Sequence, residues 1–118
     1  MKTLVMGASH KPVRYSYMAV KMLKDYNHEV VALGKRARPV EDWQILSGKP
    51  ELEGVHTITL YLNAGNQQEY YDYFLSLNPE RVIFNPGAEN SELEKLLQKN
   101  NVETVNACTL VMLRSSQY

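Results

Sequence analysis

The residues best suited to bind a ligand lie together near the start of this chain. A short apolar run, residues 3–6, ends in a tight turn that leads into a helical pattern. The turn carries the candidate ligands Gly7, Ala8, Ser9, Lys11, Arg14 and Ser16. A helix that begins directly after a strand leaves backbone N–H groups free at its start, where the helix dipole also favours negative charge. Hydroxyls and cations beside such groups are typical of a phosphate site, and in an open α/β sheet usually of a nucleotide site.

This turn differs from the standard dinucleotide fingerprint, G-x-G-x-x-G. Gly7 occupies the first glycine position, but Ser9 and Pro12 occupy the other two. The motif alone is therefore a weak indication of a nucleotide. Ser16 also has a second interpretation, because serine is a preferred N-cap of helices.

A second group of cations follows the next apolar run, residues 29–33. Gly34 precedes Lys35, Arg36 and Arg38, at the point where NAD-binding folds usually carry an acid that holds the ribose hydroxyls. Three cations in place of that acid favour a ligand with an extra phosphate near the ribose. Coenzyme A, with its 3′-phosphate, and NADP, with its 2′-phosphate, both meet this requirement, and a solvated basic loop is the alternative.

Short apolar runs alternate with helical patterns along the whole chain. Strands are predicted at residues 3–6, 29–33, 56–62, 81–84 and 102–105. Helices are predicted from residue 13 or 16 to 26 and at 67–77, 91–99 and 109–114. Residues 35–54 form the least regular part, with one helical turn predicted at 42–46. We therefore predict an α/β fold with one domain over residues 1–118: a Rossmann-like, doubly wound parallel sheet of five strands in three α/β/α layers.

Ligands of such folds bind where the strands end. The later strand ends add Asn63, Pro86 and Gly87 to the candidate ligands, although turns are rich in these residue types for structural reasons. The turn at residues 63–66 can also cap the helix that follows it. Cys108 lies just past the fifth predicted strand, where it could form a mixed disulfide with a ligand thiol or remain an inert small apolar residue.

The overall composition excludes several classes of function. Lysine and arginine together number 13, as do aspartate and glutamate, which argues against binding nucleic acid by bulk charge. The single cysteine indicates a reducing compartment, and no apolar run approaches the roughly 20 residues of a membrane span. We expect a soluble, cytoplasmic protein. The three histidines do not have the spacing of metal ligands, so we predict no metal site. No arrangement of serine, histidine and an acid suggests a nucleophile with its base, so we predict no catalytic residues.

Taken together, these segments resemble the small stand-alone CoA-binding proteins and the N-terminal CoA-binding domain of the succinyl-CoA synthetase α subunit. The resemblance covers nearly the whole chain. It rests on residues 5–9 with the basic residue and serine that follow, on Lys35, on residues 86–90 and on residues 106–112. One difference is that Leu33 and Gly34 stand where the family often has Asn-Pro before the lysine. The resemblance implies binding of CoA or acyl-CoA, and it does not imply catalysis.

Three interpretations of the function remain open. The first is a CoA-binding module without chemistry of its own, which could form a homo-oligomer or serve a partner enzyme. The second is a small NADP-dependent oxidoreductase. This interpretation is disfavoured because the 118 residues contain no second domain or obvious proton donor that would complete a substrate site. The third is an interaction module that keeps the same loops but binds no ligand.

The cations after residue 33 generate a first prediction: the protein binds CoA more tightly than NAD. The extra phosphate of CoA has cationic partners in this segment, whereas the NAD ribose lacks its usual acid. Calorimetric titration with both ligands measures the difference, and CoA affinity should fall as salt is added. Equal affinities, or a preference for NAD, would contradict the prediction.

Overall fold

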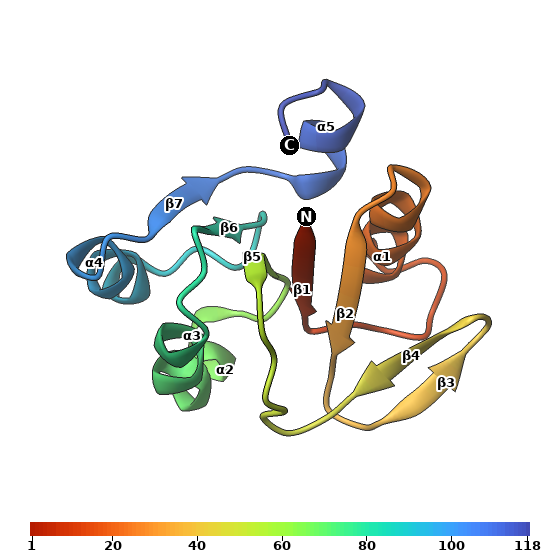
Figure 1. Ribbon diagram of the computed structural model, residues 1–118, viewed down its shortest axis with the longest axis horizontal. Helices are drawn as coiled ribbons and strands as arrows, with labels where there is room; N and C mark the ends of the chain where they lie inside the picture. Colours follow the sequence, from red (N-terminus) through yellow and green to blue (C-terminus); the bar gives the residue numbers. More distant parts are fainter.

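The computed structural model describes residues 1–118 and shows a mostly parallel sheet of seven strands between two layers of helices (Figure 1). The strands are β1 (Lys2–Met6), β2 (Glu29–Leu33), β3 (Arg38–Val40), β4 (Trp43–Leu46), β5 (Val55–Leu60), β6 (Arg81–Phe84) and β7 (Glu103–Asn106). The helices are α1 (Tyr15–Asp25), α2 (Ala64–Gln67), α3 (Tyr71–Leu77), α4 (Ser91–Lys99) and α5 (Thr109–Arg114), with a 3₁₀ turn, η1 (Gln68–Tyr70). None of the helices combines the length and hydropathy that crossing a membrane would require.

The strand order, β3-β4-β2-β1-β5-β6-β7, places β1 inside the sheet. The chain runs from β1 outward to β2 and later returns to pair β5 with the other side of β1, both in parallel. The winding direction therefore reverses beside β1. In open α/β sheets, the crevice outside the carboxyl ends of the strands at such a reversal is the usual ligand site.

The prediction of five strands was wrong, because the segment predicted to be irregular forms a β-hairpin. β3 and β4 are antiparallel to each other, and β4 joins the parallel sheet only through Ala32–Ile45 and Leu33–Leu46. The helical turn predicted at 42–46 is instead the strand β4. Its side chains alternate in burial, with Ile45 buried and Gln44 exposed, and this period of two belongs to a strand. Pro39 lies in β3 at the edge of the sheet, where proline is tolerated.

The helix predicted at 67–77 also differs in the structure. It is divided into α2, η1 and α3, and it begins earlier because Asn63 Oδ1 accepts a hydrogen bond from the Asn66 N–H at 3.0 Å. Asn63 is therefore the N-cap, within the turn at residues 63–66 that was predicted to cap this helix. The other predicted helices and the five predicted strands occur close to their expected positions.

Each face of the sheet has its own core. The larger cluster includes Leu4, Met6, Phe74 and Phe84, and lies on the face covered by α3 and α4. The smaller cluster lies under α1 and α5, where the sheet also carries buried polar residues. On that face Asn85 donates to Thr59 Oγ1 at 2.6 Å and accepts from the Thr109 N–H at 2.8 Å. These bonds tie the start of α5 to the carboxyl ends of β5 and β6.

The turn after β1 packs tightly against the end of β2. The N–H groups of Gly7 and Ala8 both donate to the Leu33 carbonyl, at 2.9 and 3.0 Å, and Gly7 has a φ of +84° that favours glycine. A Cβ atom at Gly34 would lie only 2.8 Å from the Ala8 carbonyl oxygen. The position of the turn thus depends on the absence of a side chain at residue 34.

Substitution of Gly34 by alanine should therefore destabilise the protein and displace the first turn. Overpacking of this kind costs about 1–3 kcal/mol of folding free energy. The atom that the new Cβ would meet belongs to the backbone, so the clash cannot be relieved by the rotation of a side chain. Chemical denaturation measures the loss. Gly65→Ala, in α2, is the matched control. A Cβ atom at Gly65 would have no neighbour closer than 3.6 Å, and alanine favours a helix. Equal stability of the two variants would contradict this account of Gly34.

Candidate functional site

Three cavities lie along the carboxyl edge of the sheet, around the first turn. The first, which we name the turn cavity, has a volume of about 390 Å³. It is lined by Gly7, Ser9, Lys11, Arg14, Tyr15, Ser16 and Tyr61. Five of these residues were predicted from the sequence as ligands, and the structure brings them together. Tyr15 and Tyr61 were not predicted.

The start of α1 faces the turn cavity without a side-chain cap. Arg14, and not Ser16, is the N-cap residue, and its side chain makes no capping hydrogen bond. The capping role considered for Ser16 is therefore wrong: Ser16 is the second residue of the helix, 5% exposed, and lines the cavity. Ser9 Oγ accepts from the Lys11 N–H at 3.1 Å, which fixes the turn. Uncapped N–H groups of an 11-residue helix, beside two cationic side chains, are suited to an anion.

The second cavity, the basic cavity, adjoins the first through Ser9. It has a volume of about 310 Å³ and is lined by Ala8, Ser9, His10, Lys35, Arg36, Arg38 and Ile45. No acidic residue lines it. The guanidinium of Arg38, from β3, lies 3.1 Å from the Nδ1 atom of His10. Desolvation, followed by the charges of Arg38 and Lys11, lowers the pKa of His10 below its ordinary value, so this cavity disfavours further positive charge and favours an anion.

The third cavity, the inner cavity, is small, about 60 Å³, and lies between the ends of β2 and β5. It is lined by Met6, Gly7, Leu33, Gly34, Lys35, Leu62, Asn66, Glu69 and Tyr70. Gly34 and Lys35 were predicted; Asn66, Glu69 and Tyr70 were not. The only sequence signal for them is their place in the helical segment directly after the strand end at Leu60, and that signal does not select individual residues.

Three of the predicted ligands lie outside these cavities. Asn63 lines none of the three, and its side chain caps α2. Pro86 and Gly87 also line none of them, and the Gly87 N–H donates to Glu89 Oε1 at 2.9 Å. Cys108 is a half-buried free thiol at the start of α5. No group of three or more histidine, cysteine and acidic side chains is arranged to hold a metal ion.

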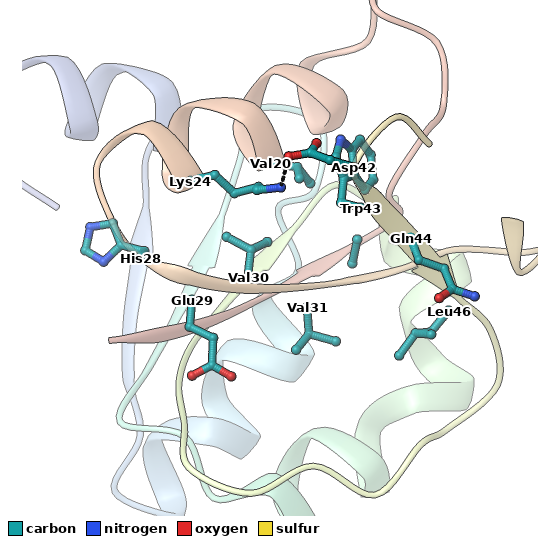
Figure 2. A pocket seen from close by; sticks show the side chains of 11 residues that line it. Val20, Lys24, His28, Glu29, Val30, Val31, Asp42, Trp43, Gln44 and Leu46 are labelled. Carbon is teal, nitrogen blue, oxygen red and sulfur yellow. Dashed lines mark hydrogen bonds and ion pairs between the residues drawn. The ribbon is translucent and has the colours of Figure 1, made fainter. Parts of the chain in front are cut away.

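A further cavity, of about 470 Å³, lies nearer the amino end of β2 (Figure 2). It occupies the gap between β2 and the diverging β4, and Val20, Val30 and Trp43 are among its lining residues. The ion pair between Lys24 and Asp42, 3.1 Å, is the only close charge contact drawn there. The lining is mostly apolar, and the cation of Lys24 is already paired, so this cavity is less suited to an anion than the three at the carboxyl edge.

Comparisons with known proteins cover nearly the whole chain. A family model described as a CoA binding domain matches residues 1–114. A crystal structure of an uncharacterized protein is 47% identical to the chain and has a TM-score of 0.96, with 99% of this chain and 97% of that chain covered. No curated protein matches the chain.

More distant structures share the fold. A protein from Thermus thermophilus is 17% identical, with 99% of this chain and 90% of that chain covered and a TM-score of 0.85. A hypothetical protein from Pyrococcus horikoshii OT3 is 19% identical, with 96% and 81% covered and a TM-score of 0.86.

The lowered pKa of His10 leads to a prediction about anions. Pyrophosphate should raise the pKa of His10, because a bound anion offsets the charges of Arg38 and Lys11 that lower it. Titration of the histidine ring signals by NMR, with and without pyrophosphate, measures the change. His28 and His56 serve as internal controls, since both lie at the opposite end of the strands. An unchanged His10 pKa at saturating pyrophosphate would exclude an anion beside His10.

Proposed function

Because the chain belongs to the CoA binding domain family, we propose that it binds coenzyme A or an acyl-CoA along the carboxyl edge of its sheet. The observation that carries the proposal is that the three cavities are neighbours with lining residues in common. The turn cavity shares Ser9 with the basic cavity and Gly7 with the inner cavity. Lys35 lines both the basic cavity and the inner cavity. One extended ligand with several phosphates matches this arrangement better than a small anion does.

The charges suggest how the ligand is oriented. We assign the diphosphate to the turn cavity, where Ser9, Lys11, Arg14 and Ser16 surround the start of α1. The ribose phosphate then lies by Lys35 in the basic cavity. Gly7, which has no side chain, also lines the turn cavity, and Ala8 lines the basic cavity. Gly34 keeps the turn in place. Asn63, Pro86 and Gly87 are more distant candidates on the neighbouring loops.

NADP is the second candidate ligand, because the basic cavity suits a 2′-phosphate as well as a 3′-phosphate. Identification of the molecule that copurifies with the protein separates the two. The protein is denatured, and the released small molecules are identified by mass spectrometry. A CoA species supports the proposal, and a nicotinamide nucleotide contradicts it. If no ligand is released, calorimetric titration with CoA, acetyl-CoA and NADP decides between the two. Failure of CoA and acetyl-CoA to bind would contradict the proposal.

Substitution of Arg14 by alanine should weaken CoA binding while the protein stays folded. A charge-assisted hydrogen bond to phosphate contributes roughly 1.5–3 kcal/mol, or about ten- to a hundredfold in affinity. Arg14 is exposed and makes no side-chain hydrogen bond within the protein, so its loss should not lower the melting temperature. Lys35→Ala should have a smaller effect, because lysine is a point charge without a bidentate fork. Arg114→Ala, at the end of α5, is the control for the lost charge; an equal loss of affinity in this control would contradict the role of Arg14.

A further inference from the structure

The inner cavity contains two opposite charges that the protein itself leaves unpaired. Glu69, in the turn η1, and Lys35, after β2, both line the cavity. The four ion pairs of the structure are Lys2–Glu29, Lys21–Glu41, Lys24–Asp42 and His56–Glu80. Neither Glu69 nor Lys35 takes part in them. A carboxylate and an ammonium group that line the same small cavity are therefore both free to meet a ligand.

The fold also explains why an acid comes from η1. An acid that holds ribose hydroxyls usually follows the second strand of a nucleotide-binding sheet, but here that position belongs to Gly34. A side chain there would collide with the Ala8 carbonyl oxygen, 2.8 Å from an added Cβ. The next residue, Lys35, carries the opposite charge. Glu69 brings a carboxylate to the same cavity from the β5 side, beyond the N-cap Asn63 and α2.

The neighbouring aromatic residue holds this part of the chain in place. The ring of Tyr70 stacks on Phe74, with centroids 5.9 Å apart and an interplanar angle of 22°, and Phe74 is fully buried. Tyr70 also lines the cavity. Glu69 thus directly precedes a residue whose ring packs on the core.

We propose that Glu69 accepts a hydrogen bond from the ribose hydroxyl adjacent to the ribose phosphate that Lys35 binds. The inference rests on the proposed binding of CoA and extends it to a specific subsite. A ribose phosphate carries an anion and a donor hydroxyl on neighbouring carbons, and the Lys35–Glu69 pair offers a cation and an acceptor across one cavity. The inner cavity, about 60 Å³, is the smallest of the three and shares Lys35 with the basic cavity, so we place the hydroxyl in the inner cavity and the phosphate in the basic cavity.

The opposite expectation is that Glu69 only repels a ligand with several phosphates. The two alternatives predict opposite signs for the isosteric variant Glu69→Gln. Loss of a repulsive charge would tighten binding, whereas loss of a charged acceptor for the ribose hydroxyl weakens it. We expect affinity for adenosine 3′,5′-bisphosphate, a fragment of CoA, to fall about tenfold in Glu69→Gln.

A second ligand makes the test specific to the hydroxyl. The 2′-deoxy form of adenosine 3′,5′-bisphosphate lacks the donor, so it should bind the unaltered protein about tenfold more weakly than the ribose form does. Its affinity for Glu69→Gln should equal its affinity for the unaltered protein. This double cycle isolates the single interaction. Glu103→Gln, on β7 at the far edge of the sheet, controls for the change of net charge, and thermal melting checks that each variant is folded.

The outcomes separate the subsite from the function. The role of Glu69 would be overturned if Glu69→Gln bound the bisphosphate as tightly as the unaltered protein or more tightly. It would also be overturned if the substitution weakened binding of the ribose and deoxyribose ligands equally. In both cases, CoA binding by the unaltered protein would still uphold the proposed function. If the unaltered protein binds neither CoA nor the bisphosphate, both proposals are wrong. A loss in Glu69→Gln confined to the ligand with a 2′-hydroxyl supports the subsite.

Discussion

The close approach of the first turn to the end of β2 determines the geometry of the site. Two N–H groups, those of Gly7 and Ala8, share the Leu33 carbonyl, and this arrangement requires a positive φ at Gly7 and no side chain at Gly34. All three cavities at the carboxyl edge border this contact. The two glycines are therefore structural conditions for the site, whatever contact they make with a ligand.

The sequence predicted the parts of the protein that obey local rules. Continuous apolar runs identified five of the six parallel strands, and the hydroxyls and cations after β1 identified most of the turn cavity. The hairpin β3–β4 was missed because Pro39 and three nearby glycines and prolines, Gly48, Pro50 and Gly54, indicated irregular structure. Only tertiary pairing with Ala32 and Leu33 makes β4 a strand of this sheet.

The residues that were missed at the site have a different physical origin. Glu69 and Tyr70 reach the inner cavity because α2 and η1 start from the end of β5, next to β1. Their sequence gives no sign of this, since an exposed glutamate and a tyrosine in a helical segment are ordinary. Pro86 and Gly87, by contrast, have the composition of a ligand loop but lie outside the three cavities. Residue type locates the edge of the sheet, and the strand order decides which residues meet there.

The narrow attachment of the β3–β4 hairpin has a consequence for local stability. Only two residue pairs join it to β2, whereas β1 pairs along its length with strands on both sides. Regions with few pairing contacts open at a lower free energy than the global unfolding of a protein. Amide protons of the hairpin should thus exchange with solvent faster than those of β1. Because Arg38 belongs to β3 and lines the basic cavity, each such opening would remove one wall of that cavity while leaving the turn cavity intact.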